Sequence, residues 1–480
     1  MKDEEKMIYE NPLITRYAGR EMSFVFSDDN KFRKWRQLWI ALAKAQQSLG
    51  LNITSAQIAE MEKFAGDINY AVAADREKET RHDVMSHIYA FGCQAKSAMP
   101  IIHLGATSCF VTDNAEILMI CEALEIIKAK LVSVLNKLKN FALRYKDMPT
   151  LGFTHLQPAQ LTTVGKRATL WMQDLAMDIE TLEHLNAITK LRGVKGTTGT
   201  QASFLNLFDG DHEKVKQLEK LVGEQLGFAA AYGVTGQTYP RKYDYLVMSA
   251  LSGIAQSAAK FSSDLRLLQH MKEIEEPFEK EQVGSSAMAY KRNPMRSERI
   301  AGLARFVISL PQNEANTSAT QWLERTLDDS ANKRITIAQG FLALDGILNL
   351  YINIADHMAV YEKVIAKHIA AELPFMATEN ILMECVKQGG SRQDLHERIR
   401  MHSMESGKAV KLEGKENDLI ARIKQDAVFK AVHGKLNALL DPKNFIGRAP
   451  QQTAEFIKAE IDPILQKYKF YLDIKAEIKV

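Results

Sequence analysis

The chain has 480 residues, 46% of them hydrophobic and 25% charged, which is typical of an ordinary globular protein. Its formal net charge of +3 is too close to balance to indicate a nucleic-acid or anionic-membrane partner. The first ten residues are charged and lack the apolar stretch of a secretory signal, and no apolar run reaches the roughly 18 residues that span a bilayer. The four cysteines form no CxxC pair, so we expect reduced thiols in a cytoplasmic protein and no zinc site.

Helical periodicity dominates the sequence, and its longest example begins near residue 113. Apolar residues recur at alternating intervals of three and four from Ile117 to Phe141, which predicts one apolar stripe along a long helix. Asp113 with Glu116 three residues later is typical of a capping box, so we expect this helix to begin at Asp113. Ending near residue 145, it has a length of roughly 50 Å at about 1.5 Å per residue.

Four more long helices are expected further along the chain. The first begins at Pro158, since proline suits a first helical turn, and ends near Leu191. The others cover about 241–274, the residues after Pro294, and about 328–358. Helices of this length are unusual against a mean of about 11–12 residues. They indicate an extended bundle in which some apolar stripes face other subunits.

Short segments rich in Gly, Thr, Ser, His and Arg lie between these helices. We expect the chemistry there, because rigid helices position loops and loops carry reactive groups. The segments are 102–112, 151–160, 193–203, 233–241 and 281–294.

The string GSSAMAYKRNP, which begins at Gly284, carries the strongest functional signal. Glycine and the serines allow backbone N–H groups to converge on an anion, and Lys291 can hold a carboxylate. A bare Gly-Ser-Ser is usually a flexible surface loop. The full string, however, resembles the GSSxMPxKxNP motif of the fumarase/aspartase superfamily, with Ala289 where that family usually has proline.

Two other segments resemble motifs of the same superfamily. In THLQPAQ, His155 precedes an expected helix N-terminus, which disfavours the charged imidazole. In HLGATS, Thr107 and Ser108 can donate hydroxyls to an anion at the next helix start. Taken alone, a histidine at a helix start is more often structural, and simple capping explains the two hydroxyls equally well.

Further matches are similar to adenylosuccinate lyases of the animal type, and together they run from about residue 12 to 455. They are Arg16-Tyr17, Arg81-His82-Asp83, Gln237, KGTTGTQASF at 195–204, RTLDDSAN at 325–332, LPFMATEN at 373–380, GGSRQD at 389–394 and GRAPQQ at 447–452. Arg325, Ser330 and Arg334 are spaced five and four apart, so they can share one face near a helix start. Two guanidiniums and a hydroxyl suit a phosphate monoester.

The resemblance implies an all-α fold in three helical domains: an N-terminal domain at 1–107, a central long-helix bundle at 108–360 and a C-terminal domain at 361–480. It implies a homotetramer with active sites shared between chains. It also implies the elimination of fumarate from succinylated purine nucleotides, namely adenylosuccinate and succinylaminoimidazole-carboxamide ribotide, without a metal or other cofactor.

The same resemblance assigns roles to individual residues. Ser285 is the expected base, His155 the expected acid and Lys291 a stabilising cation, although the sequence alone does not separate Ser285 from Ser286. The expected substrate-binding residues are Arg16, Tyr17, Arg81, His82, Asp83, Thr107, Ser108, Gln237, Asn293, Arg299, Arg325, Ser330 and Arg334. A metal pair at His82 and His87 is not expected, because five residues is a poor spacing for two ligands on one helix face.

Two other functions stay open at this point. One is another fumarate-releasing lyase, such as one that acts on argininosuccinate; its substrate has no phosphate, so the cluster of Arg325, Ser330 and Arg334 disfavours it. The other is a structural homologue that has lost activity. Retention of both Ser285 and His155 disfavours that function.

Overall fold

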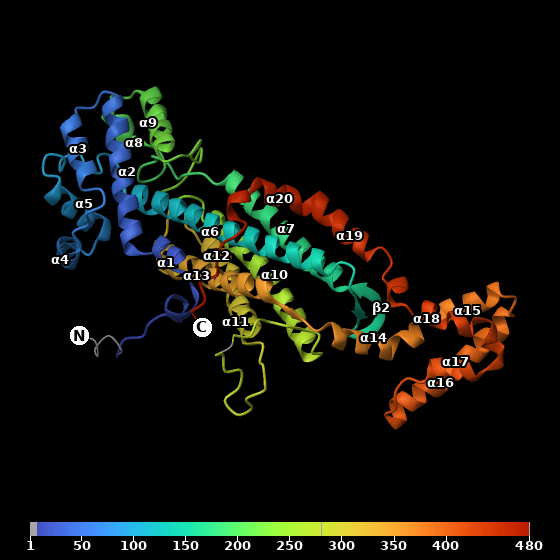
Figure 1. Cartoon of the computed structure of the whole chain (residues 1–480). Helices are drawn as coiled ribbons and strands as arrows, with labels where there is room; N and C mark the ends of the chain where they lie inside the picture. The colour runs from blue at the N-terminus through green and yellow to red at the C-terminus, as the bar shows by residue number, and fades with distance from the viewer. Residues whose placement is uncertain (1–6, 280, 480) are drawn as a thin grey trace.

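The computed structural model describes residues 7–279 and 281–479, and it confirms the predicted all-α class. One end of the elongated molecule is formed by short helices around the long helix α2 (Figure 1). These elements are a π-helical turn at Leu13–Tyr17, α1 (Arg20–Val25), α2 (Asp28–Ser48), α3 (Ser55–Lys63), α4 (Tyr70–Thr80), α5 (Asp83–Gln94), α8 (Ala202–Leu207) and α9 (His212–Gln225). Apart from the turn at Leu13–Tyr17 and α1, whose buried residues belong to the core of the central bundle, they enclose a hydrophobic cluster centred on Trp35, Trp39 and Phe91.

Long helices form the middle of the molecule. They are α6 (Ser108–Arg144), α7 (Val164–Ile188), α10 (Lys242–His270), α11 (Met295–Ser309), α12 (Pro311–Ala319) and α13 (Asp328–His357). Helix α6 packs on α7 and α13, while α10 packs on α7, α11 and α13. The predicted helices after Pro294, over 241–274 and over 328–358 are therefore confirmed, with α10 ending slightly early.

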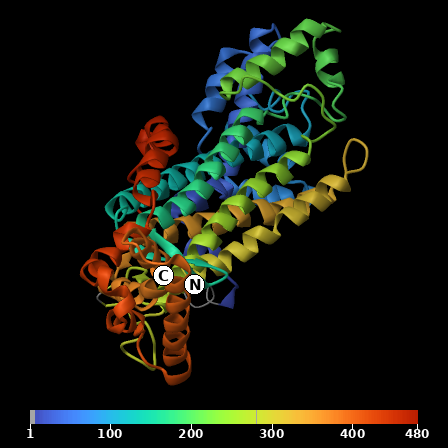
Figure 2. The same ribbon diagram turned by 90° about the vertical axis from the view of Figure 1, so that its right-hand side faces the viewer.

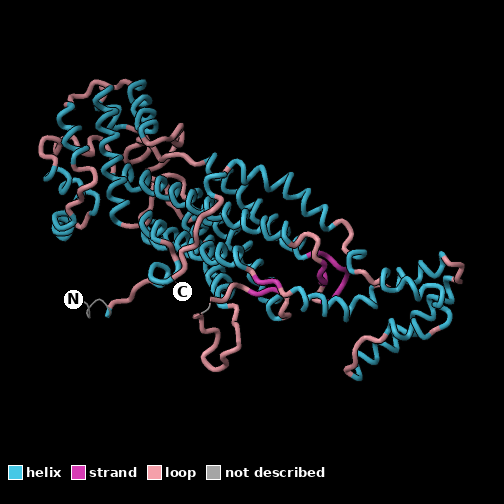
Figure 3. The backbone as a smooth tube through the Cα atoms, in the orientation of Figure 1, coloured by secondary structure: helices cyan, strands magenta, loops and turns pink. Residues whose placement is uncertain are grey.

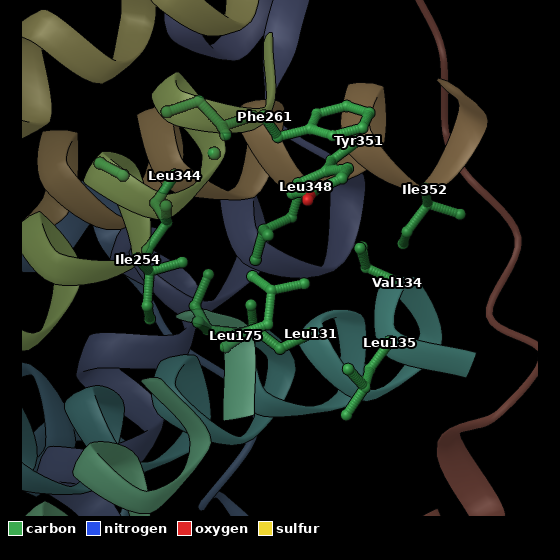
Figure 4. Close-up of a cluster of buried hydrophobic side chains, with 14 of the residues drawn as sticks. Leu131, Val134, Leu135, Leu175, Ile254, Phe261, Leu344, Leu348, Tyr351 and Ile352 are labelled. Atoms are coloured by element: carbon green, nitrogen blue, oxygen red, sulfur yellow. The ribbon is translucent and has the colours of Figure 1, made fainter. Parts of the chain in front are cut away.

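The predicted apolar stripe of α6 is buried along its whole length, from Ile117 to Phe141. Figure 4 shows Leu131, Val134 and Leu135 of α6 facing side chains of α7, α10 and α13. In the same cluster, Phe261 and Tyr351 stack with ring centroids 4.1 Å apart. This stripe is therefore covered within one chain.

Two predicted helix starts are wrong. Helix α6 begins at Ser108, five residues before the expected cap, and Asp113 is a buried residue of its second turn. Pro158 lies in a strand: β1 (Pro149–Thr154) and β2 (Gln157–Thr163) form an antiparallel hairpin, and α7 begins only at Val164. Thr163 caps α7 by accepting a hydrogen bond from the backbone N–H of Lys166 at 3.0 Å. Figure 3 shows this hairpin and the shorter pair β3 (Ile274–Glu275) and β4 (Ala359–Val360).

The remaining helices begin at the other end of the molecule, and the last two return along the bundle to pack on α7 and α6 (Figure 1). They are α14 (Glu362–Met376), α15 (Thr378–Lys387), α16 (Arg392–Glu413), α17 (Leu419–Gln425), α18 (Leu436–Leu439), α19 (Ala449–Phe456) and α20 (Asp462–Lys467), with short 3₁₀ or π turns at Ala427–Lys435, Pro442–Phe445, Ile457–Ile461 and Lys469–Tyr471. Figure 2 shows the N-terminal helices, in blue, at one end of the bundle and the helices of residues 362–425, in orange, at the other. Helix α13 is long and apolar enough to cross a membrane, but 83% of the relevant window is buried inside the protein, as expected of a core helix.

Candidate active site

A cavity of about 660 Å³ lies where α5, α6 and α13 begin, beside α2. Nine of the predicted site residues line it, although they come from four separate stretches of sequence: Arg81, His82, Asp83, Thr107, Ser108, Gln237, Arg325, Ser330 and Arg334. The sequence did not single out Asp28, Lys31 and Trp35 of α2, which also line the cavity. The structure thus brings most of the expected substrate-binding residues of one chain to one place.

The helix starts at the cavity present free hydroxyls and backbone donors. Thr107 is the N-cap of α6, but its side chain caps no backbone N–H group. His82 caps α5 through Nδ1, which accepts a hydrogen bond from the N–H of Met85, and its Nε2 lies 3.3 Å from Ser108 Oγ. With Nδ1 accepting, a neutral His82 carries its proton on Nε2 and donates to Ser108. The first turn of α6 is thereby open to an anion.

Cations surround the same space. Arg325 donates from Nη1 to Gln237 Oε1 at 2.9 Å and to Cys109 Sγ at 2.6 Å. Arg334 is 66% exposed and lies 3.5 Å from Asp83 Oδ2. Ser330 lies one turn before Arg334 on α13, as their spacing in the sequence predicted. Guanidiniums with free donors beside a hydroxyl suit a phosphate or carboxylate ligand.

The wall that carries Thr107 is fixed from behind by α2. Trp39 donates from Nε1 to His103 Nδ1 at 2.8 Å, and Gln46 donates to the carbonyl of Leu104 at 2.9 Å. His103 has a left-handed backbone (φ 69°), which non-glycine residues rarely adopt. Burial, with a smaller contribution from nearby His82, lowers the pKa of His103 to about 4. His103 is therefore neutral at physiological pH and able to accept from Trp39.

One wall of the cavity belongs to a largely buried ionic network that the sequence did not reveal. It joins Asp113 and Glu116 of α6, Tyr239, Arg241 and Asp244 at the start of α10, and Asp329 and Lys333 of α13. Tyr239 donates to Asp244 at 2.5 Å and receives a hydrogen bond from Lys333 at 3.0 Å. Burial raises the pKa of Glu116 and Asp244, against the lowering effect of Lys333. These charges cross-link the helix starts that carry the cavity residues.

The 281–294 loop lies elsewhere, beyond the end of α10 (Figure 1), and does not line the cavity. Ser285 Oγ accepts hydrogen bonds from the backbone N–H groups of Ala287 at 3.3 Å and Met288 at 3.1 Å. Two such donors stabilise a developing alkoxide, which the chemistry of a serine base requires. Asn293 donates its side-chain amide to the carbonyl of Gly284 at 2.7 Å, so it closes the loop within this chain. Lys291 is exposed.

His155 occupies a third position, at the exposed tip of the β1–β2 hairpin. It does not precede a helix, so the expected effect of a helix dipole on its charge was wrong. His155 and Leu156 both have left-handed backbones, with φ of 53° and 55°, as a two-residue turn between paired Thr154 and Gln157 requires. The hairpin follows the end of α6, whose 37 residues place it roughly 55 Å from the helix start at about 1.5 Å per residue.

The other predicted residues do not line the cavity of this chain. Arg16 is exposed and Tyr17 packs against Gly346 of α13. Arg299 is half-buried in the first turns of α11. One chain therefore places nine of the predicted residues in a cavity at one end of α6, and Ser285, Lys291 and His155 outside that cavity.

Comparison with known proteins identifies the family. Residues 20–309 match the family described as "Lyase", and residues 374–456 match "Adenylosuccinate lyase C-terminus". The chain is 52% identical to the adenylosuccinate lyase of Schizosaccharomyces pombe over 96% of both chains, and 52% identical to that of Saccharomyces cerevisiae over 97% of both. The chain belongs to the adenylosuccinate lyase family.

Membership of this family makes the protein a lyase that acts on a small molecule, and the expected resemblance is confirmed. A solved fumarate lyase from Mesorhizobium sp. BNC1 shares the fold, with a TM-score of 0.78 at 21% identity over 94% of this chain and all of that one. The two proteins therefore share the same all-α bundle fold.

Proposed function

We propose that the protein eliminates fumarate from adenylosuccinate to give AMP, and from succinylaminoimidazole-carboxamide ribotide to give aminoimidazole-carboxamide ribotide. Relatives with half of its residues identical carry the name adenylosuccinate lyase along almost the whole chain. The observation in the structure that supports this substrate class is the cavity lined by Arg81, Arg325 and Arg334 with free hydroxyls between them. A cavity of about 660 Å³ has the size of a ligand pocket.

The reaction is a β-elimination in the succinyl group. A base removes a proton from the carbon next to one carboxylate, charge spreads onto that carboxylate, and the C–N bond breaks as an acid protonates the departing nitrogen. We assign the base to Ser285, because Ser285 Oγ accepts two backbone N–H groups that stabilise its alkoxide. We assign the acid to His155. General acid and base catalysis contribute about 10²–10⁴-fold each.

Substrate binding is assigned to two sets of residues. Thr107, Ser108 and Lys291 hold the succinyl carboxylates. Arg81, His82, Asp83 and Gln237 line the pocket, and Arg16, Tyr17, Arg299, Arg325, Ser330 and Arg334 hold the remaining polar groups, the phosphate among them. Asn293 acts by closing the 281–294 loop onto Gly284 and also reaches a carboxylate when the loop meets substrate.

A complete site requires more than one chain, and we propose a homotetramer with shared sites. The cavity and His155 lie at opposite ends of α6, so one chain does not gather them. Large apolar side chains on the bundle helices are at least one-third exposed, which suits burial against a second bundle. They are Leu170, Met177, Leu246, Leu267, Phe306, Ile308 and Ile335. The three predicted domains, with boundaries at 107/108 and 360/361, and a cytoplasmic location belong to this proposal.

One assay tests the activity. Purified protein is offered adenylosuccinate and, in a parallel reaction, argininosuccinate, without added metal or nucleotide cofactor. We expect fumarate and AMP from the first substrate only. Fumarate from argininosuccinate alone identifies the alternative lyase, and no fumarate from either identifies an inactive homologue.

A further inference from the structure

Four charged residues at the cavity form a chain of alternating sign, and three of them, Asp113, Arg241 and Arg325, line the cavity. Asp113 Oδ2 lies 3.2 Å from Arg241 Nη1, and Arg241 Nε donates to Asp329 Oδ2 at 2.6 Å. The other oxygen of Asp329 lies 3.9 Å from Arg325 Nη2. The side chain of Arg325 is 22% exposed, whereas those of the other three are at most 4% exposed. The chain of ion pairs thus leads from the protein interior to the cavity surface.

Asp329 is shared unequally by the two guanidiniums. It is hydrogen-bonded to Arg241 but only in loose contact with Arg325, whose Nη1 donates to the neutral acceptors Gln237 and Cys109. Burial raises the pKa of the Cys109 thiol to about 11, so this sulfur carries no charge that neutralises Arg325. The positive charge of Arg325 is therefore available to a ligand in the cavity.

We propose that Arg241 sets the affinity of the cavity for anions by occupying Asp329 and so keeping Arg325 free. Without Arg241, the buried carboxylate of Asp329 has Arg325 as its nearest cation, because an uncompensated buried charge is strongly destabilising. Arg325 then turns toward Asp329 and its charge is cancelled. Arg241 is a positioning residue that acts through Asp329 and Arg325. The inference rests on the proposed function insofar as the anion is the phosphate of a nucleotide.

This arrangement makes an unusual prediction about the two members of one ion pair. Removing Arg241 weakens anion binding, whereas removing the charge of Asp329 leaves Arg325 fully free and does not weaken it. A pair that only holds the fold together affects binding in the same direction whichever member is removed. The sign of the Asp329 effect therefore separates positioning from simple stabilisation.

The experiment measures AMP binding by calorimetry for the full-length Arg241→Met, Asp329→Asn and double variants. We expect AMP affinity to fall about tenfold or more in Arg241→Met, the effect of losing one charge-assisted contact. Asp329→Asn binds AMP at least as tightly as the wild type, and the double variant returns to within about threefold of it. In kinetics, Arg241→Met raises KM with little change in kcat.

Arg36→Met is the matched control, since Arg36 is an equally buried arginine bonded to the Asp67 carbonyl and to Gln94, outside the cavity. It lowers Tm but leaves AMP affinity unchanged. Equal weakening by Arg241→Met and Asp329→Asn, or a double variant worse than both, overturns the proposal. If Arg241→Met does not fold, the direction in which Asp329→Asn changes AMP affinity decides between positioning and simple stabilisation. If the wild type neither binds AMP nor releases fumarate, the proposed function fails instead. Inorganic phosphate then replaces AMP as the ligand, and the same directions of change in affinity are expected for the Arg241 and Asp329 variants.

Discussion

The cavity and the 281–294 loop are both made of short segments between long helices, yet they are built in opposite ways. The cavity walls are cross-linked from behind, by Trp39 and Gln46 on one side and by the buried ionic network on the other. The loop is largely exposed and is held by contacts close to its own ends, such as Asn293 to Gly284. The cavity walls are thus fixed within one chain, whereas Ser285 lies on a largely exposed loop outside the cavity.

The largest expected effect concerns the exposed loop. Ser285→Ala removes the base, so kcat falls by about 100-fold or more. AMP binding, measured by calorimetry, stays near the wild-type value, because the cavity does not include this residue. Ser286→Ala is the matched control, since Ser285, and not its neighbour, accepts the two loop N–H groups. If Ser285→Ala keeps more than a tenth of kcat, Ser285 is not the base.

Mixed oligomers test whether the two regions meet between chains. His155→Ala and Ser285→Ala proteins are each nearly inactive on their own. After dissociation, mixing and reassociation, we expect some activity to return, because some sites receive an intact Ser285 and an intact His155 from different chains. Mass spectrometry verifies that mixed oligomers have formed. If verified mixtures stay as inactive as their parents, both residues serve a site from the same chain.

Arg334→Ala changes the cavity rather than the loop. It removes a charge-assisted contact worth roughly 1.5–3 kcal/mol, so a phosphorylated ligand binds about 10- to 100-fold more weakly. The dephosphorylated nucleoside loses far less. The measurement is the ratio of the two dissociation constants, with Arg392→Ala on the exposed start of α16 as a control that changes neither. Equal losses for AMP and adenosine mean that Arg334 does not meet the phosphate.

The smallest effect is on stability and involves the cavity wall alone. Burial lowers the pKa of His103 to about 4, so the folded protein prefers the neutral ring. This stabilisation is complete above the unfolded pKa of about 6.5 and is lost as pH falls through that value toward 4. His103→Gln keeps an acceptor for Trp39 but does not titrate. We therefore expect its free energy of unfolding to fall less than that of the wild type between pH 7.5 and 5, by about 1–2 kcal/mol, which thermal unfolding measures as a smaller drop in Tm.

His87 offers an independent control for that titration. Burial also lowers its pKa to about 4; its ring stacks on Phe32 with centroids 3.6 Å apart and meets the cavity-lining Trp35 edge-on at 5.6 Å. His87→Gln removes a similar share of the pH dependence of Tm. If His103→Gln leaves the pH dependence of Tm unaltered, the cavity wall is not stabilised through a neutral His103.

Apolar periodicity is a local pattern and predicted the long helices, whereas most of the cavity residues were predicted from the resemblance to family motifs. The prediction from the sequence misplaced the start of α7, since proline suits an exposed strand as well as a first helical turn, and nothing local distinguishes the two at Pro158. It missed the network of Asp113, Arg241 and Asp329, because the residue type alone does not show whether a charged side chain is buried or exposed to solvent. Their burial depends on helices that meet only in the folded chain.

The turn at His155 and Leu156 also has an evolutionary consequence. Two adjacent left-handed residues that are not glycine cost roughly 1–2 kcal/mol each, and Asn-Gly is the pair that such a turn favours. Selection for thermostability alone is therefore expected to replace this pair, and selection for turnover to restore the histidine. A library randomised at these two positions and sorted separately for the two properties reveals the conflict. At the hairpin tip, selection for stability and selection for turnover thus favour different residues at the same two positions.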